Sequence, residues 1–205
     1  NGDTVLVPAG GTFLTRPFNI TKSGISLQVD GYLSALIDDV GRLDGWPKVP
    51  PLPTYGRDRD GAKPMRHQAL IMMFGVQNVA LRGVGKIDGR GPWWWRTSTR
   101  KSIAAGRPHL VEVHSSSHVE ICGLTLADSP FWTLHLFHSE HIHVHDLKIR
   151  VSGRAKPVPA PSKRGALYEG MAPLWAPNTD GINPDSSRHV LIERCDVESG
   201  DDHVA

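Results

Sequence analysis

The sequence predicts an all-β solenoid, a parallel β-helix formed by residues 1–205 as one domain. Three observations lead to this prediction. An apolar pattern recurs four times, and 21 glycines with 16 prolines supply frequent turns that leave little room for long helices. Hydrophobic residues make up 39% and charged residues 21%, with 23 Lys and Arg against 21 Asp and Glu, which excludes a disordered tail, a coiled coil and a basic nucleic-acid arm. No apolar stretch approaches a membrane span, and residues 1–4 open without the features of a signal peptide.

The repeat defines the coils of the solenoid. Its four segments begin at Val79, Val119, Ile142 and Val190. In the segment from Val119, apolar residues follow at offsets of 2, 5 and 7, and the segment from Val79 matches the first three positions with Leu81 and Val84. This pattern predicts a short strand, a bend and a second short strand, with one residue in two facing a common interior.

The other elements are placed in chain order around these coils. The alternating segments 4–7 and 25–29 are expected to form the first coils. The interval from Val119 to Ile142 is 23 residues, about one coil, whereas the longer intervals before and after imply insertions. External loops are therefore expected at about 40–66, where proline is frequent, at about 91–106 and at about 150–177.

Stacking of coils about 4.8 Å apart turns equivalent positions into ladders. The position before each segment holds His118, His141 and His189, which should stack with their side chains outward. The position five residues after the start of the last segment holds Cys195, so this cysteine is expected to be a small core residue.

Three carboxylates are expected to meet near the C-terminal end of the sequence. Asp180 lies about one coil before Asp201 and Asp202, so the repeat places the three on adjacent coils at nearly the same point around the solenoid. Like charges at this spacing raise each other's pKa, which suits a proton donor and a water-activating base in one site. Two alternatives stay open: Asx turns, in which each Asp bonds its own backbone, and a Ca²⁺ site.

Basic, aromatic and histidine-rich segments allow two interpretations each. The expected loop after residue 149 carries cations without an acidic neighbour, which either bind a polyanionic sugar or are solvated; they are Arg150, Arg154, Lys156, Lys163 and Arg164. Residues 93–95, three consecutive tryptophans, either stack on sugars or pack a loop against the solenoid wall. The alternating histidines at 141, 143 and 145 diverge along a strand, so no metal site is expected, and His143 should lie over Glu120.

Several motifs resemble those of the polygalacturonases, glycoside hydrolase family 28. They are Asn178-Thr179-Asp180-Gly181, Gly200-Asp201-Asp202, Gly2–Gly10, Ile87–Gly89 running into Trp93–Trp95, Arg107-Pro108 and Ser129–His135. The resemblance implies a right-handed parallel β-helix and an inverting hydrolase of α-1,4-linked galacturonic acid. It implies Asp201 as general acid, Asp180 with Asp202 as the residues that position the water, and substrate contacts from Asn178, His203 and the basic loop.

The same resemblance sets further expectations. It implies that pectin or polygalacturonate is the partner, that no cofactor is needed, and that the protein is secreted or in the cell wall. Neither nucleic acid nor a membrane is expected as a partner. The oligomeric state is left open. The segment Asn183-Pro184-Asp185-Ser186 resembles the exo-acting and plant-like branch of the family more than the fungal endo-acting enzymes. His203 stands where the family often has Cys, and the sequence ends at Ala205 before the family's later His and Arg-Ile-Lys segments, so a solenoid truncated on its C-terminal side is expected. A catalytically inactive fragment that at most binds pectin, and a Ca²⁺-dependent pectin lyase, remain the alternatives.

Overall fold

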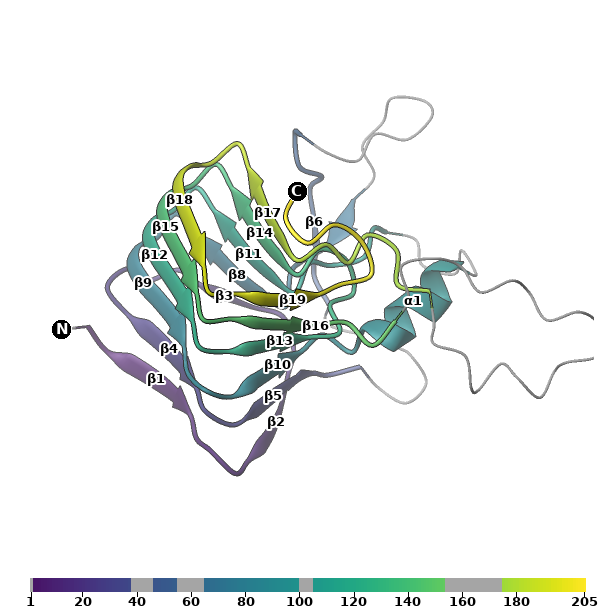
Figure 1. Cartoon of the computed structure of the whole chain (residues 1–205), viewed down its shortest axis with the longest axis horizontal. Helices are drawn as coiled ribbons and strands as arrows, with labels where there is room; N and C mark the ends of the chain where they lie inside the picture. Colours follow the sequence, from purple (N-terminus) through teal and green to yellow (C-terminus); the bar gives the residue numbers. More distant parts are fainter. Residues whose placement is uncertain (1, 38–45, 55–64, 100–104, 154–174) are drawn as a thin grey trace, which may run out of the picture.

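The computed structural model describes residues 2–37, 46–54, 65–99, 105–153 and 175–205. They form a right-handed parallel β-helix whose coils are stacked from the N-terminal to the C-terminal end (Figure 1). Three parallel sheets make its walls. Sheet A contains β1 (Thr4–Val7), β4 (Ser26–Val29), β9 (Gln77–Arg82), β12 (Ser117–Cys122), β15 (Glu140–His145) and β18 (Arg188–Glu193). Sheet B contains β2 (Thr12–Thr15), β5 (Tyr32–Ala35), β10 (Lys86–Asp88), β13 (Thr125–Ala127), β16 (Lys148–Arg150) and β19 (Asp196–Glu198). Sheet C contains β3 (Phe18–Ile20), β8 (Ile71–Phe74), β11 (Val111–His114), β14 (Leu134–Phe137) and β17 (Ile182–Asp185).

The register confirms the repeat that the sequence predicts. Val79 pairs with Val119, Val119 with Ile142, and Ile142 with Val190 on successive strands of sheet A. The inward residues of β9, β12 and β15 are buried in one continuous apolar core, and those of β18 are partly buried against it. The first coils are also confirmed, because β1 pairs with β4 in parallel. Burial of one residue in two on the inner coils stabilises the stacked sheets, whereas β1 on the first coil is largely exposed.

One inward position was predicted wrongly. Val84 is 81% exposed, whereas Leu124 and Leu147 at the same offset are buried. The strand register gives the reason: three residues separate Arg82 from Lys86, but only two separate their partners on the next coil. The extra residue in this turn pushes Val84 out into solvent. Cys195 is only partly buried against the core, since it lies between β18 and β19, the edge strands of their sheets.

The histidine ladder is confirmed. His118 stacks on His141, and His141 on His189, each pair with ring centroids 4.8 Å apart, and all three side chains are exposed. Each of these residues has a left-handed backbone, with φ between 53° and 54°. Histidine adopts this conformation more readily than most residues, so the ladder marks the tight bend at the start of β12, β15 and β18. His143 lies opposite Glu120 as expected, but its Nε2 is hydrogen-bonded to Glu193 at 3.0 Å.

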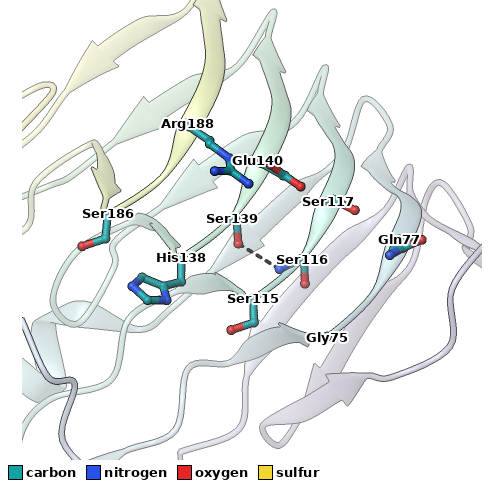
Figure 2. Close-up of a pocket in the computed structure, with 10 residues that line it drawn as sticks. All are labelled: Gly75, Gln77, Ser115, Ser116, Ser117, His138, Ser139, Glu140, Ser186 and Arg188. Atoms are coloured by element: carbon teal, nitrogen blue, oxygen red, sulfur yellow. Dashed lines mark hydrogen bonds and ion pairs between the residues drawn. The ribbon is translucent and has the colours of Figure 1, made fainter.

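Three serines, two of them buried and Ser187 half-buried, close the corner between sheets C and A. Ser116, Ser139 and Ser187 occupy equivalent places, and each hydroxyl accepts a hydrogen bond from a backbone N–H of the preceding coil at 3.0–3.1 Å. Beside this corner runs a groove of about 450 Å³, lined by hydroxyls, Gln77, His138 and the Glu140–Arg188 pair (Figure 2). The serines thus satisfy backbone donors that the bend removes from the sheet ladders.

Two of the three stretches expected as external loops contain structure of their own, and most of the third, about 150–177, lies outside the described residues. Helix α1 (Gly91–Thr99) occupies the first part of the stretch 91–106, and Trp94 and Trp95 are buried, which confirms that these tryptophans pack against the solenoid. Pro92 suits the first helical turn, where no backbone donor is needed. Within 40–66, β6 (Lys48–Val49) pairs antiparallel with β7 (Arg66–His67). No helix in the described ranges is long and apolar enough to cross a membrane.

Candidate active site

Asp180 and the pair Asp201-Asp202 lie on adjacent coils, as the repeat requires. The N–H of Gly181 donates to the carbonyl of Asp202 at 2.9 Å, and Ile182 forms a parallel bridge with Val204. Asp180 therefore stands directly opposite Asp202, at the point where the chain enters β17. Three carboxyl groups from two distant motifs are brought to one place on the solenoid wall.

Thr179 fastens the two motifs to each other. Its hydroxyl is fully buried, donates to the carbonyl of Ala176 at 2.8 Å and accepts from the N–H of Gly200 at 3.0 Å. The motif glycines are required by close approach. A Cβ on Gly181 would lie 2.4 Å from the carbonyl oxygen of His203, and one on Gly200 would lie 2.4 Å from that of Ala176. The coils can approach this closely here only because both positions lack a side chain.

The three carboxyls occupy different environments. Asp180 is 7% exposed and its Oδ2 accepts a hydrogen bond from Asn183 at 3.0 Å, while Asp201 and Asp202 are exposed. Burial raises the pKa of Asp180, the Asn183 hydrogen bond opposes this, and the charges of Asp201 and Asp202 add to the rise. Its Oδ1 is buried with no partner among the described residues. Carboxyls whose environments differ in this way can hold different protonation states at one pH.

The geometry bears on the two alternatives to catalysis. Asp201 does accept from the N–H of Asp202 at 3.1 Å, which is local turn bonding, but its other oxygen accepts from the N–H of Asn178 on the previous coil at 3.0 Å. In the described part of the chain, the groups that bring three ligand atoms within 4.8 Å of one another do not include these aspartates. The arrangement thus favours neither turn bonding alone nor a compact calcium site.

Arg107 brings a positive charge to the edge of this cluster. Its guanidinium donates to the carbonyls of Pro130 and Pro177 at 2.8 Å each and to Asn178 Oδ1 at 3.4 Å. It also lies 4.9 Å from the ring centroid of Phe131. Arg107 therefore links two loops next to the aspartates. Its position depends on loops that join distant coils, so no spacing in the sequence points to this role.

The other predicted substrate contacts are placed as follows. Arg154, Lys156, Lys163 and Arg164 lie outside the described residues. Arg150 is described and pairs with Asp196 on the next coil. His203 is exposed, and its carbonyl accepts from the N–H of Ile182 at 3.1 Å.

A buried ionic cluster lies on the outer face of sheet C. Arg66 donates two hydrogen bonds to Glu112, at 2.7 and 2.9 Å, and Glu112 also bonds His109 at 3.0 Å. Burial opposes the ionised form, but the hydrogen bonds from His109 and Arg66 hold the pKa of Glu112 well below its usual range. Next to it, burial lowers the pKa of His135 to about 3, and its Nε2 lies 3.2 Å from Asp185. A neutral His135 therefore donates from Nε2 to the Asp185 carboxylate.

This cluster adjoins the aspartates through the sheet register. His135 pairs with Asn183, the residue that donates to Asp180. His109, Glu112 and His135 also present three ligand atoms within 4.8 Å of one another, but the two Arg66 hydrogen bonds already occupy the carboxylate. A metal ion would have to displace a buried guanidinium, so this group is a structural support of the site.

Solved structures show the same architecture. An exopolygalacturonase from Thermotoga maritima matches with a TM-score of 0.69 and 24% identity, over 99% of this chain and 46% of that one. A polygalacturonase from Erwinia carotovora matches with a TM-score of 0.70 and 22% identity, over 98% of this chain and 50% of that one. At these identities the likeness shows the right-handed parallel β-helix alone.

Sequence relatives extend the likeness. A "Probable polygalacturonase" of Vitis vinifera is 36% identical over 206 residues, which is 100% of this chain and 36% of that protein. An "Exopolygalacturonase" of Zea mays is 26% identical over 207 residues, 98% of this chain and 40% of that protein. The chain thus spans between a third and a half of the length of these relatives. The sequence model of glycosyl hydrolases family 28 matches residues 2–205, and the chain therefore belongs to that family.

Proposed function

We propose that this chain carries the catalytic carboxyls of an inverting polygalacturonase, which hydrolyses α-1,4-galacturonosyl linkages of pectin. The observation that carries the proposal is the meeting of Asp180, Asp201 and Asp202 on adjacent coils, with one carboxyl buried and two exposed. Inverting hydrolysis needs an acid and a base on opposite sides of the linkage, with about 6.5–9.5 Å between them to admit a water. Adjacent coils about 4.8 Å apart with divergent side chains can supply that spacing.

The roles follow the resemblance. Asp201 donates its proton to the glycosidic oxygen as the bond to C1 breaks. Asp180 and Asp202 hold a water on the opposite face of the sugar and accept its proton as the oxygen attacks C1. The raised pKa of Asp180 fits a base that gains basicity from burial, because a carboxylate with a higher pKa is a stronger proton acceptor.

Charge and relatives support the substrate class. Arg107 lies next to the aspartates, and the sequence stretch 150–164 carries five cations; positive charge of this kind would attract the carboxylates of a galacturonan chain. Relatives named exopolygalacturonase in maize favour cleavage from a chain end. Because pectin is an extracellular polymer, the proposal includes a secreted, cell-wall-directed protein.

An assay on polygalacturonic acid tests the reaction type. The chain is incubated with the polymer while new reducing ends and the ultraviolet absorbance of unsaturated uronate are followed together. Asp201→Asn is the test variant, and Asp3→Asn, which alters an exposed carboxylate paired with Lys22 on the first coil, is the matched control. We expect reducing ends without absorbance, lost in Asp201→Asn and kept in Asp3→Asn. Rising absorbance would establish the lyase instead, and silence from folded protein would establish the inactive alternative.

A second substrate separates the acid from the base. An aryl galacturonide has a leaving group that needs little protonation. We expect this substrate to restore much of the rate of Asp201→Asn but little of that of Asp180→Asn. The reverse pattern would exchange the two assignments, with the buried Asp180 as the acid.

A further inference from the structure

A second group of ligand-bearing side chains lies on sheet A, away from the aspartates. Glu120 and Cys122 are two residues apart on β12, so their side chains share the outer face of the sheet. His145 on β15 pairs in register with Cys122. The three offer a carboxylate oxygen, a sulfur and an imidazole nitrogen that all lie within 4.8 Å of one another.

The imidazole is oriented as in many metal sites. Nδ1–H of His145 donates to Asp146 at 2.7 Å, and Arg194 holds that carboxylate with hydrogen bonds of 2.9 and 3.1 Å. Metal-binding histidines typically donate their second ring nitrogen to a carboxylate in this manner, which fixes the tautomer. When Nε2 carries no proton, its lone pair faces Glu120 Oε1, 3.3 Å away.

Two acceptors facing each other at that distance repel unless something positive lies between them. Ligand atoms around a tetrahedral zinc ion stand about 3.5 Å apart, given metal–ligand bonds of about 2.0–2.3 Å. The Nε2–Oε1 separation already matches this value. A second proton on the imidazole could take the place of the metal ion between Nε2 and Oε1. Cobalt binding distinguishes the proton from the metal ion.

The surroundings decide between this group and the buried one on sheet C. There, Arg66 is already bonded to the Glu112 carboxylate. On sheet A, His145 is the one basic side chain within 4 Å of the Glu120 carboxylate among the described residues. The Glu120 side chain is 47% exposed and that of His145 17%, so an ion can reach them from solvent. Two positive charges oppose a cation here: Arg82, in register with Cys122 on the other side, and Arg194, whose guanidinium lies 3.5 Å from His145 Nδ1.

We propose that Glu120, Cys122 and His145 bind one zinc-class divalent metal ion that joins the coils of β12 and β15. A mixed sulfur, nitrogen and oxygen set is typical of Zn²⁺, whereas Ca²⁺ and Mg²⁺ take oxygen ligands. A water would complete the tetrahedron. This site is independent of the proposed hydrolysis, because none of its residues contacts Asp180, Asp201 or Asp202 in the described structure.

Cobalt reports directly on the proposed thiolate ligand. The reduced, chelator-treated chain is titrated with Co²⁺, and the visible and near-ultraviolet spectra are recorded. We expect one ion per chain, tetrahedral visible bands, and a sulfur-to-cobalt charge-transfer band that Zn²⁺ abolishes. Cys122→Ser should lose the charge-transfer band, whereas the matched control Cys195→Ser, which alters the other free cysteine, should keep it.

A second variant keeps the proposal falsifiable if Cys122→Ser folds poorly. Asp146→Asn retains all three ligands, so we expect it to keep the charge-transfer band with an affinity about 10- to 100-fold weaker. Absence of the band in the folded parent chain, or its loss in Cys195→Ser rather than Cys122→Ser, would overturn the proposal. Binding of Co²⁺ without a thiolate band would overturn it equally, since it would place the ion elsewhere, for example on the exposed histidine ladder.

Discussion

Thr179→Val tests how the two aspartate motifs are held together. Valine has nearly the same shape as threonine but removes the hydroxyl that bonds Ala176 and Gly200 at 2.8 and 3.0 Å. Thr179 is fully buried, so water cannot replace either bond. Each buried polar group left without a partner costs about 1–3 kcal/mol. The valine leaves the Gly200 N–H and the Ala176 carbonyl unpaired, and the carbonyl can still accept through its second lone pair. We therefore expect a total loss of about 2–4 kcal/mol in the free energy of unfolding. That loss lowers the folding equilibrium constant about 30- to 700-fold.

Urea unfolding of a short variant series measures this cost. Thr179→Ser keeps the hydroxyl and loses one methyl group, so we expect a loss of about 1 kcal/mol. Thr125→Val makes the same chemical change on partly exposed β13 and should alter the free energy of unfolding by less than about 0.5 kcal/mol. We expect kcat/KM on polygalacturonate to fall on the order of tenfold to a hundredfold in Thr179→Val and to recover in Thr179→Ser. A Thr179→Val protein within about 0.5 kcal/mol of the parent would contradict a stabilising role for the two buried hydrogen bonds of Thr179.

Three further perturbations probe the surroundings of the aspartates. Gly181→Ala would place a Cβ 2.4 Å from the His203 carbonyl, so we expect a loss of about 1–3 kcal/mol in the free energy of unfolding, and an unchanged denaturation midpoint would contradict the close approach. Arg66→Met leaves Glu112 buried beside His109 alone, and we expect a loss of about 3–5 kcal/mol; a loss under about 1 kcal/mol would show that the pair is dispensable. Asp180→Asn removes a carboxyl whose pKa is raised on folding. Such a carboxyl stabilises the folded protein at low pH, where it is protonated. This contribution is lost as the pH rises through the folded-state pKa. The variant should therefore unfold at higher urea than the parent at neutral pH, with the gain shrinking in acid; a gain independent of pH would contradict the raised pKa.

The coil architecture could be predicted from the sequence because its signal is local and repeated. Each coil must bury one residue in two, so the spacing from Val119 recurs at Ile142 and Val190, and the strand register follows. The same counting placed Asp180 opposite residue 203, one residue beyond its observed neighbour Asp202. It failed at Val84, where one extra residue in a turn breaks the spacing without leaving an apolar clue.

Features set by loops were beyond the reach of this reasoning. The buried cluster of Arg66, Glu112 and His109 depends on how β7 and the segment before β11 cover sheet C, and no periodicity encodes that contact. Helix α1 forms in a stretch rich in tryptophan, and its stability comes from burying Trp94 and Trp95 against the solenoid. Pattern reasoning treats both stretches as loops, because their structure depends on tertiary packing.

The stereochemistry of the first product tests the central claim most directly. Proton NMR of polygalacturonate freshly mixed with the chain distinguishes the two anomers of the new reducing end before they equilibrate. Water activated by Asp180 and Asp202 on the face opposite the departing oxygen inverts the α-linkage. We therefore expect the β-anomer to appear first, and to be lost in Asp201→Asn. The α-anomer first, or an unsaturated uronate in its place, would contradict the assignment of these three carboxyls to inverting hydrolysis.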